Sequence, residues 1–184
     1  MRRSRALITA LFGRMGIIIG LLVGASLVTG PAMAAVPPSD PARVQLFRLW
    51  NPTVHDHFYT TSAQERDRAV ARFGYRNEGT AAQVFASPRY GATPLFRLWN
   101  PAVRDHFYTT SAEERDNAVA KYGYANEGVA AWVLASPRLG TTPLFRLWNP
   151  TIRDHFYTTS VEERNNAIVR FGYVSEGIAC EVFA

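Results

Sequence analysis

The chain is built from one segment written three times. The string LFRLWNP at Leu46 returns at Leu95 and at Leu144, a spacing of 49 residues both times. Residues 46–86, 95–135 and 144–184 align without a gap, and 24 of the 41 positions are identical in all three copies. Because one period of this kind indicates copies of one supersecondary unit, the expected repeats are 46–94, 95–143 and 144–184. The third lacks the linking tail SPRxGxTP, so residues 35–45 are expected to complete it.

Each repeat predicts two strands followed by a helix. Residues 46–50 are aromatic and β-prone, Asn51-Pro52 is a turn signal, and residues 56–61 are again aromatic and β-branched, which predicts a hairpin. Ser62 and Glu65 have the spacing of a capping box, in which the serine accepts from an amide and the glutamate reaches back.

The rest of the repeat predicts a helix of about eleven residues and a last strand. Gly74 is placed to end the helix, and Ala69, Val70 and Phe73 are spaced to form its buried stripe. A strand of small residues is expected over 80–86. One such unit buries too little apolar surface to stand alone, so the three units are expected to fold together as one domain, 35–184. The predicted fold class is α+β: three β-β-α-β repeats in a pseudo-threefold, trefoil-like closed assembly, or else an open linear stack.

The N-terminus has the composition of an export signal. Four arginines fall within the first fourteen residues, an apolar run follows over 15–29, and Pro31-Ala32-Met33-Ala34 offers small residues in the A-x-A arrangement. We therefore expect residues 1–34 to be a cleaved signal peptide and the mature protein to be secreted, with no membrane partner after cleavage. Outside this segment the remaining 16 basic and 15 acidic residues nearly balance, which argues against nucleic acid as a partner.

The single cysteine, Cys180, has no partner for an intramolecular disulfide. Its equivalents in the other repeats are Ala82 and Ala131. A position that accepts either residue predicts a small buried core site, since a free cysteine packs like a small hydrophobe.

Side chains suited to sugar recognition are retained in and beside each hairpin turn. A flat aromatic ring can cover a sugar face, while amide, carboxylate, imidazole and phenol groups can bond its hydroxyls. The candidate ligand-binding residues are Trp50, Asn51, Asp56, His57, Tyr59, Trp99, Asn100, Asp105, His106, Tyr108, Trp148, Asn149, Asp154, His155 and Tyr157. Many of these residues also have structural explanations: the tryptophans suit a core, Asn51 and Asp56 are good turn formers, and Arg48 or Arg66 could pair with Glu78.

Neither a catalytic nor a metal site is predicted, and no cofactor. Asp56, His57 and Ser62 are the residue types of a hydrolytic triad, but adjacent strand residues point to opposite faces and Ser62 is explained as a helix cap. His57, His106 and His155 could meet on an axis and hold zinc, although their spacing matches no recognised ligand pattern. Hydrogen-bonded histidines are the simpler interpretation. A metal-binding or hydrolytic use of the Asp-His pairs is the lesser alternative.

The string LFRLWNPxxxDHFYTTSxxER, followed by GY and EG, resembles a tandem-repeat module of uncharacterised function. Such modules occur on exported bacterial and fungal proteins, often beside extracellular hydrolase or peptidase domains. The resemblance implies a non-catalytic accessory module. The expected function is binding of a polysaccharide or another repetitive extracellular surface; the alternative is a structural or protein-interaction domain without small-ligand sites.

Overall fold

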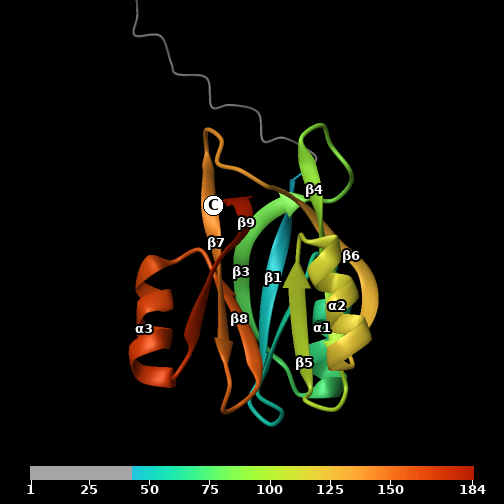
Figure 1. Cartoon of the computed structure of the whole chain (residues 1–184), viewed down its shortest axis with the longest axis vertical. Coiled ribbons are helices and arrows are strands. Elements are labelled where there is room, and N and C mark those ends of the chain that lie inside the picture. Colours follow the sequence, from blue (N-terminus) through green and yellow to red (C-terminus); the bar gives the residue numbers. More distant parts are fainter. Residues whose placement is uncertain (1–42) are drawn as a thin grey trace, which may run out of the picture. The chain divides into compact units, whose positions relative to one another are not determined.

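A computed structural model describes residues 43–184, and the structural statements below concern these residues. Each repeat contributes two strands, a helix and a third strand, in the order expected (Figure 1). The elements of the first repeat are β1 (Arg43–Asn51), β2 (Asp56–Thr60), α1 (Ala63–Phe73) and β3 (Arg76–Phe85). The second repeat supplies β4 (Ala92–Asn100), β5 (Asp105–Thr109), α2 (Ala112–Tyr122) and β6 (Ala125–Leu134). The third supplies β7 (Thr141–Asn149), β8 (Asp154–Thr158), α3 (Val161–Phe171) and β9 (Val174–Phe183).

The expected fold class and assembly are both wrong. Strands hold 51% of the described residues and helices 23%, so the protein is mostly β. The nine strands form one open antiparallel sheet, ordered β2-β1-β3-β6-β9-β7-β8 with β4 and β5 joined to β6, and not a trefoil-like closed assembly. A linear stack does not describe it either, because β3 of the first repeat also pairs with β9 of the third, at Gln83 and Phe183. The strand content exceeds the expectation because the third strand of each repeat begins four residues before residue 80 and its equivalents, and the first strand starts in the linking tail.

Within a repeat, the first strand lies between the other two. β1 pairs with β2 as a hairpin, in which Trp50 faces His57 across the pair. On its other side β1 pairs with β3, with register shifts after Leu46 and after Arg48. Such irregularities bend and twist a strand, and Gly79 adopts φ 99° in this part of β3. The same shifts recur in β4 and β7.

The helix ends follow the sequence signals, but the buried face does not. The Ser62 hydroxyl accepts from the Glu65 amide, and Gly74 ends α1 with φ 77°. Of the expected stripe only Ala69 is buried, whereas Val70 is 43% and Phe73 57% exposed. The small alanine lets α1 sit close to β1 and β2, and the large aromatic at the end of the helix is left on the surface. In Figure 1, α3 flanks the strands on the side opposite α1 and α2.

The three repeats share one interior. Its central cluster takes the same four positions from every repeat: Leu46, Tyr59, Ala82 and Val84 with their equivalents Leu95, Tyr108, Ala131, Val133, Leu144, Tyr157, Cys180 and Val182. Cys180 therefore occupies the small buried site expected for it, with 3% of its surface exposed. Each repeat adds a smaller cluster beneath its own helix.

Three fully buried tyrosines join the repeats at this interior. The Tyr59 hydroxyl donates to the Tyr157 carbonyl at 2.7 Å and accepts from the Tyr157 amide at 2.9 Å. Tyr108 bridges the amide and carbonyl of Tyr59 in the same way, and Tyr157 those of Tyr108. The rings pack edge-on, with centroids 5.5 Å apart. Since β2, β5 and β8 each pair with a single strand, these hydroxyls satisfy backbone groups that a further strand would otherwise bond.

The links between repeats are exposed turns. Tyr90, in the link from β3 to β4, and Leu139, in the link from β6 to β7, are fully exposed. Arg43–Gln45 pair with β3 of the first repeat, while the Arg43 guanidinium lies 3.5 Å from the centre of the Phe183 ring. The predicted signal peptide, 1–34, and the start of the segment expected to complete the third repeat, 35–42, lie outside the described residues.

Removing one buried hydroxyl tests the tyrosine contacts. Tyr59→Phe leaves the amide and carbonyl of Tyr157 without their partner, so we expect the free energy of unfolding to fall by about 2–4 kcal/mol. Urea denaturation would measure this. Tyr90→Phe, which loses a fully exposed hydroxyl, is the control and should change nothing; equal stability of the two variants would contradict the assignment.

Burial raises the pKa of the Cys180 thiol to about 12. We therefore expect a thiol reagent at neutral pH to label the folded protein no faster than the protein unfolds, because the reactive species is the thiolate. Labelling that is fast and unaffected by conditions that slow unfolding would show that the side chain is accessible.

Candidate functional site

Three buried carboxylates lie at the meeting point of the hairpins. Asp56, Asp105 and Asp154 begin β2, β5 and β8, are fully buried, and have carboxylate oxygens within 4.8 Å of one another. Like charges this close repel, and buried charges need several hydrogen bonds to persist. The structure supplies those bonds from two repeats at once.

Each aspartate accepts from the histidine of a different repeat. The backbone amide of His57 lies 2.7 Å from Asp154 Oδ1, and its Nδ1 lies 2.6 Å from Oδ2. His106 contacts Asp56 in the same manner, and His155 contacts Asp105. A carboxylate can only accept, so the imidazole donates from Nδ1 in this contact. His57 Nε2 lies 3.9 Å from Glu78 Oε2.

Each aspartate also accepts a hydrogen bond from a tyrosine of its own repeat. Tyr173 donates its hydroxyl to Asp154 Oδ2 at 2.5 Å, and Tyr75 and Tyr124 do the same for Asp56 and Asp105. Burial and the neighbouring carboxylate raise the pKa of the Tyr173 hydroxyl, so it remains a donor. Three donors from two repeats therefore hold each buried negative charge.

The Asp–His contacts are not those that a zinc site or a catalytic triad would need. The aspartates are the single group in residues 43–184 with the spacing of metal ligands, and both oxygens of each already have protein partners. The three histidines bind separate carboxylates and do not form a common ligand set. Asp56 contacts His106 instead of its neighbour His57, and Ser62 serves as the helix cap, so the triad suggested by the sequence does not assemble within a repeat.

An arginine links each repeat to the helix of another. Both terminal nitrogens of Arg48 bond the Glu163 carboxylate at 2.9 Å, and its Nε bonds Glu78 at 2.8 Å. Arg97 binds Glu65 and Glu127 in the same way. Arg146 bonds Glu114 with both terminal nitrogens, and its Nε forms an ion pair with Glu176 at 2.9 Å. The expected pairing of Arg48 with Glu78 is thus present, whereas Glu163 was expected to reach back within its own capping box. The amide of Ser160 instead donates to Thr158 Oγ1, which leaves Glu163 available to Arg48.

The arginine contact controls the ionisation of the glutamate. Partial burial raises the pKa of Glu163, but hydrogen bonds from Arg48 and Thr158 outweigh it and hold the pKa below its usual range. The same causes lower the pKa of Glu65 and Glu114. These carboxylates stay charged to lower pH in the folded protein than in the unfolded chain.

Aromatic rings stack across each junction between repeats. The Trp50 and His57 rings have centroids 4.4 Å apart, and the far side of His57 meets Phe156 of the third repeat at 4.7 Å. The guanidinium of Arg48 lies 5.3 Å from the centre of the Phe156 ring, close enough for a cation–π contact. The same stack recurs as Trp99, His106 and Phe58 and as Trp148, His155 and Phe107.

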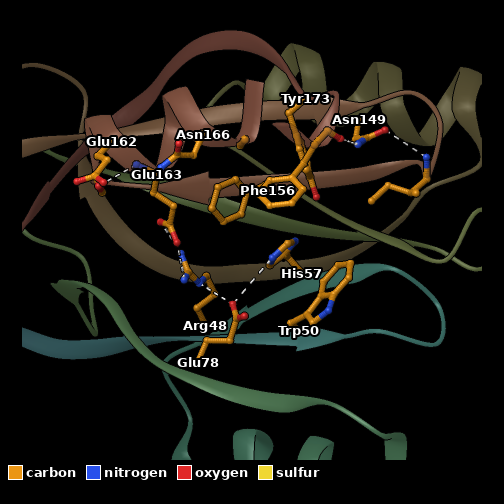
Figure 2. A pocket seen from close by; sticks show the side chains of 14 residues that line it. Arg48, Trp50, His57, Glu78, Asn149, Phe156, Glu162, Glu163, Asn166 and Tyr173 are labelled. Atoms are coloured by element: carbon orange, nitrogen blue, oxygen red, sulfur yellow. Dashed lines mark hydrogen bonds and ion pairs between the residues drawn. The ribbon is translucent and has the colours of Figure 1, made fainter. Parts of the chain in front are cut away.

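A cleft opens beside each stack. The cleft between the first and third repeats, here the 1/3 cleft, has a volume of about 870 Å³. Figure 2 shows Arg48, Trp50, His57 and Glu78 on one side of it, with Phe156, Glu163 and Tyr173 facing them. The 3/2 cleft, with Trp148, measures about 1050 Å³, and the 2/1 cleft, with Trp99, about 390 Å³.

Each cleft is also lined by an exposed aromatic from the end of the neighbouring helix. Phe171 lines the 1/3 cleft and is 65% exposed, Tyr122 lines the 3/2 cleft and is 67% exposed, and Phe73 lines the 2/1 cleft. These three residues were missed because the helical spacing assigned Phe73 to the core. The change between phenylalanine and tyrosine at this position was the available signal, since a buried ring seldom gains an unpartnered hydroxyl.

The candidate residues named from the sequence fall into three groups. The half-buried tryptophans and the histidines line the clefts. The asparagines are buried, and Asn100 and Asn149 also line a cleft. Their hydrogen bonds are local: Asn51 accepts from the amide of Thr53 and donates to the carbonyl of Phe73, which ties the turn to the end of α1. The aspartates and Tyr59, Tyr108 and Tyr157 lie beneath the clefts and hold the repeats together.

The fold and its clefts define a module of three β-rich repeats joined by buried polar contacts. The chain belongs to the family described as Domain of unknown function (DUF5648), whose model matches residues 31–183. Comparison with curated proteins and with solved structures finds no match. No helix among the described residues is long and apolar enough to cross a membrane.

The Arg–Glu contacts predict acid sensitivity. The pKa of Glu65, Glu114 and Glu163 is lowered on folding. The ionised carboxylates therefore add their full share to the free energy of unfolding above the ordinary pKa of 4.5, and this share is lost as the pH falls through the pKa of the folded protein. We expect Glu163→Gln to be less stable than the wild type at neutral pH and to lose less stability on acidification. Thermal denaturation from about pH 6 to about pH 3 would measure both. The control is Glu113→Gln, which removes the charge of an exposed glutamate on α2. Equal acid profiles for the wild type and both variants would contradict the argument.

Proposed function

We propose that this protein is an exported, non-catalytic module that binds polysaccharide in the three clefts between its repeats. The observation that supports this most directly is the pair of aromatic side chains in each cleft, one tryptophan and one exposed ring from the neighbouring helix. Two aromatic rings that line one cleft are suited to the apolar faces of a sugar. Their separation along the chain, 121 residues for Trp50 and Phe171, means that each cleft exists only when the repeats are assembled.

Polar groups around the rings suit the hydroxyls of a sugar. Glu78 and Glu163 keep 32% and 39% of their side chains exposed while they hold Arg48, so each retains acceptor capacity. Ser160 and Asn166 line the same wall. A sugar of an uncharged polysaccharide needs this combination of one or two flat faces and a few directional partners.

Export and multivalency agree with this proposal. The arginine-rich and apolar N-terminal segment with its A-x-A site supports secretion. The resemblance to modules that accompany extracellular hydrolases supports a surface-binding role. Three weak sites on one body would raise the affinity for a polymer well above that for a single sugar.

One observation favours a second candidate, a purely structural or protein-interaction role. Asp56, Asn51, Tyr59 and their equivalents are fully engaged in contacts within the protein, so their retention in every repeat needs no ligand. On this view the exposed aromatics would still need a partner protein. The two candidates differ in what the clefts bind.

Variants at the exposed ring separate the candidates. We expect Phe171→Ala to fold normally and to lower the affinity for the recognised polysaccharide about threefold to tenfold, because one stacking contact is lost. Val169→Ala, 82% exposed on the same helix but outside the cleft, is the matched control. The measurement is a pull-down with cellulose, xylan, chitin and peptidoglycan, followed by calorimetry with the polymer retained. Binding to none of them, or equal binding by both variants, would contradict the proposal.

A further inference from the structure

The three clefts share their aromatic walls but differ in charge. The wall residue Asn166 of the 1/3 cleft is replaced by Arg68 in the 2/1 cleft, although Asn117 of the 3/2 cleft repeats it. The 3/2 cleft gains Lys121 and Arg153 instead. Each of these two clefts therefore carries a cation that the 1/3 cleft lacks.

Counting the formal charges makes the contrast plain. The 1/3 cleft is lined by three carboxylates and one guanidinium: Glu78, Glu162, Glu163 and Arg48. The 3/2 cleft is lined by three acidic and three basic side chains, and the 2/1 cleft by two of each. The 1/3 cleft is the acidic one of the three.

The turn beside the tryptophan adds to the difference in charge among the clefts. The residue with φ near 60° in this turn is Arg104 in the second repeat and Arg153 in the third, but His55 in the first. Arg153 lines the 3/2 cleft, whereas the His55 ring lies 6.1 Å from Trp50, centroid to centroid. The first repeat therefore has an imidazole in this turn where the other two repeats have a guanidinium.

The single cation of the 1/3 cleft is already bonded. Arg48 contacts both oxygens of Glu163 and one oxygen of Glu78, which leaves the cleft with an excess of negative charge beside the Trp50 and Phe171 rings. Carboxylates around aromatic faces favour an ammonium group, which can bond the former and lie over the latter.

We propose that the 1/3 cleft binds an amino sugar with a free, protonated amine, while the other two clefts take uncharged sugars. This inference rests on the proposed function and adds to it the class of sugar at one site. The sugar ring would lie between Trp50 and Phe171, with its ammonium group beside Glu78 and Glu163. An N-acetylated sugar has no charge to offer and gains nothing from the acidic cleft.

The test compares a glucosamine hexamer, an N-acetylglucosamine hexamer and a glucose hexamer, each titrated calorimetrically into the purified full chain. The pH is kept low enough to protonate the amine and high enough to ionise the carboxylates. We expect the glucosamine hexamer to bind one site about tenfold more tightly than either uncharged oligomer, and to lose that advantage as salt is added.

Variants that copy the other repeats identify the cleft. Asn166→Arg introduces the residue found at position 68, and Glu162→Gln the residue found at position 64. We expect the first to weaken glucosamine-hexamer binding about tenfold and the second by a few-fold, each with a smaller effect on glucose-hexamer binding. Asp116→Asn removes an exposed carboxylate of α2 that lines none of the three clefts and should leave both affinities as they are. Unaltered thermal stability shows that each variant is folded.

Each other outcome has a definite meaning. Binding of the uncharged oligomers without preference for glucosamine, unaffected by Asn166→Arg, would overturn this inference and leave the proposed function standing. Equal weakening by Asp116→Asn and Glu162→Gln would overturn it as general attraction to an acidic surface. An acetylated lysine amide that competes as well as the glucosamine hexamer would overturn it in favour of a protein side chain. Binding of no oligomer or polymer would overturn both proposals.

Discussion

The structure depends on buried carboxylates that no repeat can satisfy alone. Asp154 has its tyrosine partner nearby in the chain, but its histidine partner, His57, comes from 97 residues away. Leaving such a charge buried without that partner would cost several kcal/mol. The same holds for Asp56 and Asp105, so each repeat requires another. The Asp–His contacts therefore specify how the repeats are arranged, and the shared apolar interior stabilises that arrangement.

The clefts follow from the same contacts. Once Asp154 fixes the imidazole of His57, the ring is held between Trp50 and Phe156, and the tryptophan is presented at the surface instead of in the core. Arg48 then spans the junction to reach Glu163 on α3. Several residues that suggested binding groups in the sequence thus position other residues. The groups left open to solvent are the exposed aromatic rings at the helix ends and the partly exposed glutamates.

Local structure could be predicted from the sequence, and contacts between repeats could not. The hairpin, the serine cap and the terminal glycine depend on neighbours within a few residues, and they stand where the pattern placed them. Tyr59 and Asp56 looked like surface ligands because their partners, Tyr108 and His106, are 49 and 50 residues distant. Glu65 looked like half of a capping box because its arginine lies in another repeat. Periodicity also misplaced Phe73, since the close approach of Ala69 to the sheet leaves the next turn of the helix outside it.

The exposed links lie apart from the buried polar contacts that join the repeats, and the contact between the links themselves is a hydrogen bond from Arg138 to the Gly91 carbonyl at 3.4 Å. Tyr90 and Leu139 project fully into solvent, whereas the Asp–His, Arg–Glu and tyrosine bonds between repeats are made by side chains well away from these turns. A protease could therefore cut at either link without removing a single one of the Asp–His, Arg–Glu or tyrosine bonds. The nicked protein would remain one particle, held together as a non-covalent complex of its own fragments.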